Sequence, residues 1–254
     1  MDFPVYISVG NWQIHPHLFF EFLAYPIAFS LLLRRRFRQH SITPSQRSSV
    51  IVGGMVGALL GSKILVLLQH IYLVRENWQL WLLLLVRGKT IVGALLGGLI
   101  GVELTKKLIG VKRSTGDVFV YPLIVGMAIG RIGCFLTGLN DKTYGIATNL
   151  PWGVDFGDGV YRHPTQLYEI IFLLVLGLFL QIRSKYRRQE GDLFKFFMAA
   201  YLGFRLIIDF LKPDFHLLPE LSAIQIACIG GLIYYRRSIL EIFQFTKTHK
   251  NHAQ

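Results

Sequence analysis

The sequence predicts an all-α integral membrane protein with seven transmembrane helices, an outward-facing head loop, an N-terminus outside the membrane and a C-terminus in the cytoplasm. Three observations predict this fold class. Hydrophobic residues make up 52% of the 254 positions and charged residues only 17%, against the about 25% typical of soluble domains. Apolar runs near the roughly 20 residues that cross a bilayer recur along the chain. Basic residues gather in every second connection between these runs.

The apolar runs define the expected spans, which we place in a single membrane domain over residues 1–254. The segment 78–86 (WQLWLLLLV) is too short to cross a bilayer, and its two tryptophans favour an interfacial or re-entrant piece. The expected spans are residues 17–33, 49–73, 90–109, 118–138, 165–182, 192–211 and 221–236.

The lysines and arginines indicate the orientation of the chain. They are concentrated in residues 34–47, 106–113, 183–188 and 236–254, and the connections between these segments contain few. Cytoplasmic loops are enriched in Lys and Arg, so we expect these four segments in the cytoplasm. The net charge of +12 is then mainly a topological signal with affinity for anionic headgroups. No nucleic acid partner is expected.

Glycines spaced four residues apart occur in the second and third expected spans. The hexapeptide VGALLG at residues 56–61 returns at residues 92–97, and each copy extends into a ridge of glycines. Small residues at this spacing let helix backbones approach closely, so we expect the ridges to be packing surfaces of the two spans. The ridges are Gly53, Gly57, Gly61 and Gly93, Gly97, Gly101.

The longest extramembrane loop is expected over residues 139–164, on the outer side of the membrane. It is rich in glycine and contains Asp155, Asp158, Arg162 and His163. Loops on a rigid scaffold often provide binding residues, so we expect this head loop to bind the polar part of a substrate.

Charged residues inside the spans are costly in hydrocarbon and therefore point to a site. Arg131 lies in the fourth span, Glu21 near the outer end of the first, and Arg205 and Asp209 share one face of the sixth. One interpretation is an internal salt-bridge network, for instance Arg205 with Asp209 and Glu21 with Arg131. The other is that both arginines converge on one cavity, where guanidinium groups suit a phosphate.

Several motifs follow one another along the chain. GRIGCF lies at residues 130–135, PWGVDF at 151–156, RHPTQLYE at 162–169 and FRLIIDFLKPD at 204–214. With these motifs the sequence resembles the prolipoprotein diacylglyceryl transferases of bacteria over most of its length. The combination of the first and third motifs is specific.

The resemblance implies a multi-pass enzyme of the bacterial plasma (inner) membrane that needs no cofactor. Its partners would be phosphatidylglycerol, prolipoprotein signal peptides with a lipobox cysteine, and membrane lipids. The diacylglyceryl group would pass to the cysteine thiol as a thioether, with release of glycerol phosphate.

The resemblance also assigns roles to residues. Arg131 would hold the lipid phosphate, Arg205 would assist, and Asp209 would orient Arg205. His163 would act in catalysis, although it also suits a structural role in a loop-to-helix start that Thr165 caps. The other expected substrate-binding residues are Arg162, Gln166, Tyr168, Glu169, Gly133, Gly145 and Tyr25.

Four positions depart from the family pattern. Val92 stands where the family has a catalytic histidine, Glu21 where it has a tyrosine, Cys134 where it has an asparagine and Leu139 where it has an acidic residue. Glu21 or His163 would then replace the missing base, or the arginines would suffice. The alternative is a divergent paralogue that binds or transports anionic phospholipid.

Other chemistry finds little support in the sequence. GKT at residues 88–90 lacks the earlier glycine of a phosphate-binding loop. Cys134 and Cys228 do not have the spacing of metal ligands, and no HExxH motif occurs, so no metal is implied. The reacting cysteine would belong to the substrate, so neither cysteine is expected to be a nucleophile.

Overall fold

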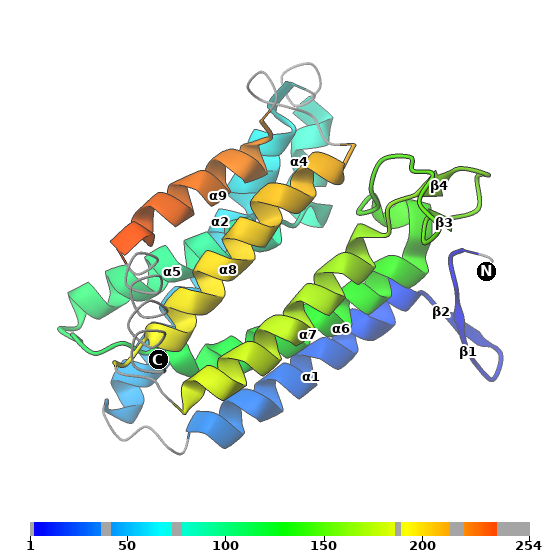
Figure 1. Cartoon of the computed structure of the whole chain (residues 1–254). Helices are drawn as coiled ribbons and strands as arrows, with labels where there is room; N and C mark the ends of the chain where they lie inside the picture. The colour runs from blue at the N-terminus through cyan, green and yellow to red at the C-terminus, as the bar shows by residue number, and fades with distance from the viewer. Residues whose placement is uncertain (1–2, 37–41, 73–77, 186–188, 214–220, 238–254) are drawn as a thin grey trace, which may run out of the picture. The chain divides into compact units, whose positions relative to one another are not determined.

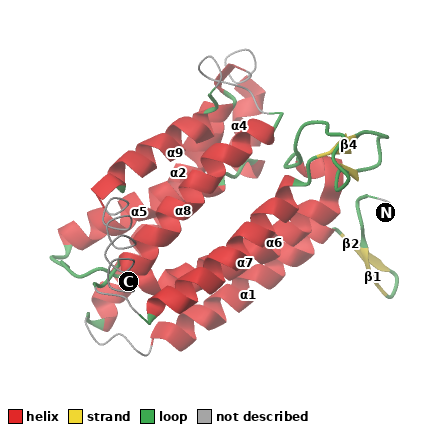
Figure 2. Cartoon of the chain, viewed as in Figure 1, coloured by secondary structure: helices red, strands yellow, loops and turns green. Residues whose placement is uncertain are grey.

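The computed structural model describes residues 3–36, 42–72, 78–185, 189–213 and 221–237, and most of them are helical (Figure 2). The strands form two short antiparallel hairpins. β1 (Ile7–Val9) pairs with β2 (Trp12–Ile14) before the first long helix, and β3 (Val154–Asp155) pairs with β4 (Tyr161–Arg162) in the expected head loop. The predicted helical class is confirmed. Of the basic segments used to predict orientation, residues 37–41, 186–188 and 238–254 lie outside the described residues.

The chain divides into two compact units, and the first comprises Met1–Gln39, Thr115–Phe197 and Phe210–Pro213. At its centre α6 packs against both α1 and α7, and the three helices run side by side (Figure 1). Val120, Leu173 and Leu180 are completely buried in this unit. Its helical segments are α1 (Pro16–Arg36), η1 (Gly116–Phe119), α6 (Val120–Thr137), η2 (Gly138–Asp141) and α7 (Thr165–Ser184).

The second unit comprises His40–Ser114, Met198–Asp209 and Asp214–Gln254. Its principal pair is α2 with α5, and α9 packs against both. The boundary between the units runs through α8 (Asp192–Ile208), which is followed by the short turn η3 (Asp209–Leu211). The other helices are α2 (Pro44–Gln69), α4 (Trp78–Arg87), α5 (Ile91–Leu108) and α9 (Ala223–Tyr234).

Several helices are long and apolar enough to cross a membrane. Four described helical segments meet this condition, and α4 with α5 adds a fifth if the two count as one broken span. The last two expected spans coincide with α8 and α9, which have 17 and 12 residues. These findings agree with an integral membrane protein. Seven spans, the single membrane domain and the orientation stay predictions. The four segments are Pro16–Arg34, Pro44–Gln69, Gly116–Asp141 and Thr165–Ser184.

The glycine ridges of α2 and α5 pack against each other. A Cβ atom added to Gly57 would collide with the carbonyl oxygen of Gly97, and one added to Gly97 would collide with that of Gly57. The same reciprocal relation joins Gly61 with Gly93. The prediction that these ridges are packing surfaces is confirmed, because only hydrogen atoms fit between the two backbones.

The short apolar segment before the third expected span forms a separate helix. The segments Trp81–Arg87 and Ile91–Leu108 meet at a bend of 75°. Lys63 Nζ donates to the carbonyl oxygens of Val86 at 3.2 Å and Gly88 at 2.7 Å, which satisfies the end of α4. Thr90 N donates to Ser62 Oγ at 2.9 Å at the start of α5. The intramembrane Lys63 therefore has a structural partner in this junction.

Candidate functional site

Arg131 lies on α6 within the first unit and is paired with a carboxylate from α7. Its Nε is 2.9 Å from Glu169 Oε2, and the two side chains are only 8% and 3% exposed. The motifs GRIGCF and RHPTQLYE thus meet in one buried ion pair. A charge removed from water needs such a partner, because an isolated ion in an apolar interior is strongly disfavoured. Both residues were predicted for the site, and the structure brings them together.

Gly133 allows α1 to approach α6 next to this ion pair. A Cβ at Gly133 would lie 2.9 Å from Phe20 Cβ and 3.3 Å from the carbonyl oxygen of Pro16. The close approach places His17, one turn before Glu21 on α1, beside Cys134 on α6. Gly133 therefore acts in helix packing.

A cluster of polar side chains forms where α1 meets the end of α6. His17 Nδ1 is 3.0 Å from Asp141 Oδ1 and 4.0 Å from Cys134 Sγ, and Arg131 donates to the same sulfur at 3.8 Å. On the other side of the ring, His17 Nε2 is 3.5 Å from Glu21 Oε2. Sequence reasoning missed His17 and Asp141, because nothing in the sequence shows that these segments meet.

Tyr25 and Glu21 are neighbours on α1. The Tyr25 hydroxyl donates to Glu21 Oε1 at 2.9 Å, one helical turn away. Tyr25, which was expected in the site, therefore donates a hydrogen bond to Glu21, the residue at the position of the family tyrosine.

The third motif begins α7 and fixes the head loop to it. Thr165 Oγ1 donates to the Thr143 carbonyl oxygen at 2.5 Å, and Gln166 Nε2 donates to Thr143 Oγ1 at 3.1 Å. The prediction that Thr165 caps the helix is wrong, since Pro164 occupies the cap position without a side-chain cap bond. The Thr165 hydroxyl instead satisfies a loop carbonyl. Thr143 Oγ1 in turn donates to Asp141 Oδ2 at 2.6 Å.

His163 and Tyr168 form a second polar contact at the loop. His163 Nδ1 is 3.1 Å from the Tyr168 hydroxyl, which also accepts a hydrogen bond of 2.8 Å from Trp152 Nε1. The backbone N–H of Gly145 donates to the His163 carbonyl oxygen at 2.8 Å. A Cβ at Gly145 would lie 2.6 Å from His163 Cβ, so this glycine permits the loop to close on the histidine. These contacts agree with the structural interpretation of His163.

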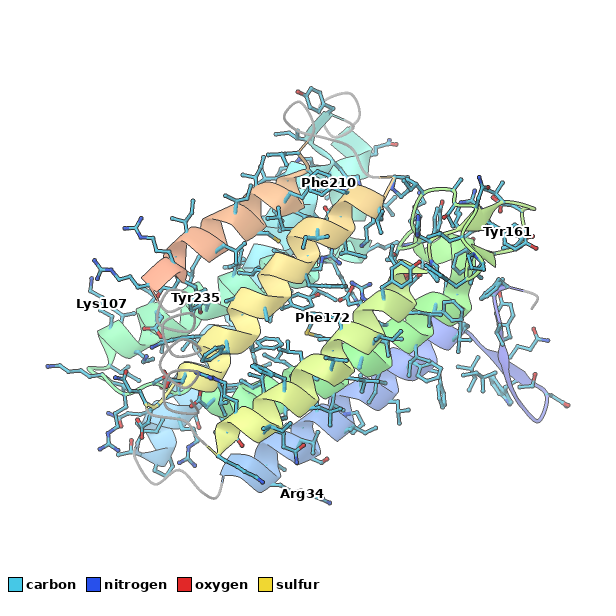
Figure 3. All side chains as sticks on the ribbon, in the orientation of Figure 1. Arg34, Lys107, Tyr161, Phe172, Phe210 and Tyr235 are labelled. Carbon is cyan, nitrogen blue, oxygen red and sulfur yellow. The ribbon has the colours of Figure 1, made fainter. Side chains whose placement is uncertain are left out.

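Arg162 is bound by Asp158 in the head loop. Arg162 Nη1 and Nη2 donate to the two Asp158 carboxylate oxygens at 2.6 and 2.7 Å, and the guanidinium carbon lies 5.2 Å from the centre of the Tyr144 ring. Hydrogen bonds from Arg162 lower the pKa of Asp158, and the carboxylate raises the pKa of Arg162. Asp155 accepts backbone N–H bonds from the turn that follows it. Tyr161, labelled in Figure 3, lies on β4 of the same loop.

The second unit contains a further buried ion pair. Arg205 Nη2 is 2.9 Å from Asp209 Oδ1, and the side chains are 4% and 0% exposed. Asp209 Oδ2 also accepts a hydrogen bond of 2.6 Å from Ser222, which forms the capping box of α9 with Gln225. The expected ion pair of Arg205 with Asp209 is present, and it ties the end of α8 to the start of α9.

Val92 lies on α5 in this second unit and is 1% exposed. Arg131 and Arg205 belong to different units, so their convergence on one cavity stays a prediction.

Comparison with known proteins gives consistent matches. Residues 4–239 match the family described as prolipoprotein diacylglyceryl transferase. The phosphatidylglycerol–prolipoprotein diacylglyceryl transferase of Clostridium tetani is 32% identical over 74% of this chain and 77% of that protein. The protein of the same name from Bordetella parapertussis is 30% identical over 87% of this chain and 86% of its own length. That of Thermotoga maritima is 26% identical over 86% of this chain and 77% of its own.

Proposed function

The chain belongs to the prolipoprotein diacylglyceryl transferase family, and we propose that it transfers the diacylglyceryl group of phosphatidylglycerol to the lipobox cysteine of prolipoproteins. This is the first step of lipoprotein maturation. The observation that most supports the proposal within the chain is the buried pair of Arg131 and Glu169, which joins the two specific motifs. A fixed cation in a low-dielectric setting is what the departing phosphate requires.

The reaction makes two demands on the protein. The cysteine thiol must approach the thiolate, because at its ordinary pKa of about 8.5 it is mostly protonated near neutral pH. The thiolate then forms a carbon–sulfur bond with the glycerol carbon of the lipid, while the bond from that carbon to the phosphate oxygen breaks. Glycerol phosphate leaves, and the thiol proton is taken up by a basic side chain of the protein.

The residue roles follow the family motifs. Arg131 holds the lipid phosphate and Arg205 assists, with Asp209 orienting Arg205. A guanidinium suits this task because its planar fork can bind phosphate through two parallel hydrogen bonds. Glu21 or His163 accepts the proton in place of the residue replaced by Val92.

The remaining motif residues shape the site. The hydrogen bonds of Gln166, and the contact between Tyr168 and His163, hold the head loop on α7. Gly133 and Gly145 provide close backbone approaches, and Tyr25 positions Glu21. Arg162 is engaged by Asp158 and supports the loop that meets the polar part of the substrates.

The proposed setting is the bacterial plasma (inner) membrane. We place the N-terminus and the head loop outside and the C-terminus in the cytoplasm, as the basic connections indicate. The partners are then phosphatidylglycerol from the surrounding bilayer and the signal peptides of prolipoproteins.

A direct assay tests the proposal. The purified protein is incubated with phosphatidylglycerol and a lipobox peptide, and the mass of the peptide is measured by mass spectrometry. We expect a mass gain of one diacylglyceryl group, and none for a matched peptide with serine in place of cysteine. No gain from a folded preparation would refute the proposal and favour a paralogue that binds or transports anionic lipid.

The position of the missing histidine allows a second test. Val92→His is expected to increase the rate of transfer, because it restores a proton acceptor at the family position. The buried site is tight, so the variant is compared with Val92→Leu, which adds bulk without a titratable group. Equal rates for the two variants would show that position 92 does not supply a base in this protein.

A further inference from the structure

Three side chains with metal-binding atoms meet in the first unit. His17 Nδ1, Cys134 Sγ and an Asp141 carboxylate oxygen all lie within 4.8 Å of one another. They come from α1, α6 and η2. Among the described residues, this is the one group of at least three His, Cys, Asp or Glu side chains with such an arrangement. We call it the His17–Cys134–Asp141 cluster.

The distances are close to those that a tetrahedral ion requires. Zinc bonds of about 2.3 Å to sulfur and 2.0–2.2 Å to nitrogen or oxygen place neighbouring ligand atoms about 3.3–3.6 Å apart. The measured separations are 3.0 Å from His17 Nδ1 to Asp141 Oδ1 and 4.0 Å from His17 Nδ1 to Cys134 Sγ. The Cys134 sulfur and the Asp141 carboxylate lie within 4.8 Å of each other, so the sulfur would have to turn inward for the three atoms to bind one ion. The same ring nitrogen faces both the sulfur and the carboxylate, which is the arrangement of ligands around a shared centre.

Each of the three side chains is also oriented by a neighbour. His17 Nε2 faces Glu21 at 3.5 Å, so a carboxylate holds the far side of the imidazole. Such carboxylate–histidine contacts accompany most metal-ligating histidines and fix the tautomer. Thr143 donates to Asp141 at 2.6 Å, and Arg131 donates to the Cys134 sulfur.

The supports of the cluster come from one face of α7. Glu169 pairs with Arg131, which contacts Cys134, and Gln166 donates to Thr143, which holds Asp141. Gln166 and Glu169 are three residues apart and therefore share a helix face. Two residues of the motif RHPTQLYE thus hold two of the three ligands in place through an intermediate side chain.

We propose that His17, Cys134 and Asp141 bind a Zn²⁺ ion whose remaining position takes the sulfur of the prolipoprotein cysteine. The ligand set suits zinc, which accepts thiolate, imidazole and carboxylate together. Three protein ligands leave a coordination position open, and His17 and Asp141 retain 34% and 11% side-chain exposure, which gives access. This inference rests on the proposed function for the identity of the fourth ligand.

The ion would make the substrate thiol easier to deprotonate, and the proton acceptor would still be Glu21 or His163. A thiol that coordinates a metal ion is deprotonated, so its proton would pass to Glu21 or His163 before the reaction. The substrate thiolate would then form the carbon–sulfur bond as the bond between carbon and phosphate oxygen breaks. Arg131 donates to the sulfur of Cys134, so the residue proposed to hold the departing phosphate is next to one of the metal ligands. No oxidant or reductant is required.

Metal binding is tested on the full chain in detergent, without lipid or peptide. The protein is treated with a chelator and titrated with Co²⁺, which gives a near-ultraviolet charge-transfer band when it binds thiolate. We expect one Co²⁺ per chain, displaced by Zn²⁺, and loss of the band in Cys134→Ser. Cys228→Ser, which changes the other buried cysteine, keeps the band. His17→Asn should weaken Co²⁺ binding, and His15→Asn, its matched control, should not.

Two results would overturn the site. One is the absence of the Co²⁺ charge-transfer band from the wild-type chain, and the other is a band that persists in Cys134→Ser. In both cases thermal unfolding must show that the proteins are folded. Glu21→Gln is a second probe that leaves the ligands intact, and we expect it to weaken Co²⁺ affinity by about 10- to 100-fold. Unchanged affinity in Glu21→Gln would contradict the assigned support of His17.

A second measurement tests the role of the ion. Chelator-treated protein is expected to lose diacylglyceryl transfer by at least about tenfold and to regain it with Zn²⁺. Full transfer without metal would overturn thiol activation while leaving the proposed function intact. A chain that gives the cobalt band but, after it has been reloaded with Zn²⁺, transfers nothing would instead refute the proposed function and the role given to the ion.

Discussion

The charge of Arg131 is matched by a carboxylate from another helix. Glu169 lies on α7, and its oxygen is 2.9 Å from Arg131 Nε in a buried setting. The pair places a guanidinium at a fixed point, so little reorganisation is needed when a phosphate departs. The proposed role of Arg131 therefore depends on the planar shape of the guanidinium group as well as on its charge.

Arg131→Lys is expected to reduce diacylglyceryl transfer by at least about tenfold, because an ammonium cannot reproduce two parallel hydrogen bonds to phosphate. Arg183→Lys is the matched control, since Arg183 stacks on the Phe196 ring at 3.8 Å and has no assigned role in transfer. Initial rates of peptide modification measure both. A normal rate for Arg131→Lys would remove the phosphate-holding role from this residue.

Glu169→Gln tests the ion pair itself. Removing one partner of a buried pair typically costs about 3–5 kcal/mol, so a clear decrease in thermal stability in detergent is expected. The double variant Arg131→Met with Glu169→Leu should recover stability but remain inactive. If the double variant were active, the pair would serve packing alone.

The head loop offers a test of the Asp158–Arg162 pair. The pKa of Asp158 is lowered by Arg162, so the pair is fully formed above the ordinary aspartate pKa of about 3.9 and is lost only as pH falls through the lowered value. At neutral pH, Asp158→Asn should release Arg162 and speed tryptic cleavage after it. Glu190→Gln, at another exposed acidic residue, is the control. Equal cleavage would show that the pair does not order the loop.

The sequence indicates the charged residues but not their arrangement. Arg131, Arg205, Asp209 and Glu21 stand out because charge is rare in apolar helices, whereas Glu169 was expected only from the family motif. The Arg205–Asp209 pair follows from spacing along one helix. The Arg131–Glu169 pair and the contact of His17 with Asp141 depend on how separate helices align, and that alignment leaves no local pattern in the sequence.

At the scale of the elements, the glycine ridges of α2 and α5 decide how closely the two backbones pack. Gly57 and Gly97 meet so tightly that neither position has room for a methyl group. Their repeated spacing made this contact predictable, because a helix places residues four apart on one face. The bend between α4 and α5 was less predictable, since it depends on a hydrogen bond that Ser62 accepts and one that Lys63 donates, both on another helix.

Gly97→Ala is expected to destabilise the second unit by about 1–3 kcal/mol through overpacking. Gly98→Ala is a close control, because a Cβ there would lie 3.4 Å from the Gly54 carbonyl oxygen and 3.5 Å from Ala58 Cβ, near ordinary contact. Thermal unfolding in detergent compares the two. Equal stability of both variants would mean that the ridges are not in close contact in the folded protein.

At the scale of the whole molecule, the helices fall where the apolar runs predicted them, because run length and hydropathy determine which segments avoid water. The two units each contain a buried arginine with its carboxylate. The orientation rests on the basic connections and predicts opposite sides for the N-terminal hairpin and the segment before α8.

Membrane-impermeant maleimide labelling checks this orientation. Ser8→Cys should be labelled from outside intact cells, and Glu190→Cys should be labelled only after the membrane is opened. The native Cys134 and Cys228 are buried, so they give little background. Labelling of both introduced cysteines from the same side would reject the predicted topology.

The central claim is that the protein makes a thioether while it releases the phosphate headgroup held by Arg131. The most direct measurement uses phosphatidylglycerol with an isotopic label in the headgroup glycerol, and quantifies labelled glycerol phosphate and modified lipobox peptide in one reaction. The account predicts equal amounts of the two products from the wild-type protein and neither in significant amount from Arg131→Lys. A folded wild-type protein that leaves the peptide unmodified, or that releases glycerol phosphate without forming the thioether, would contradict it.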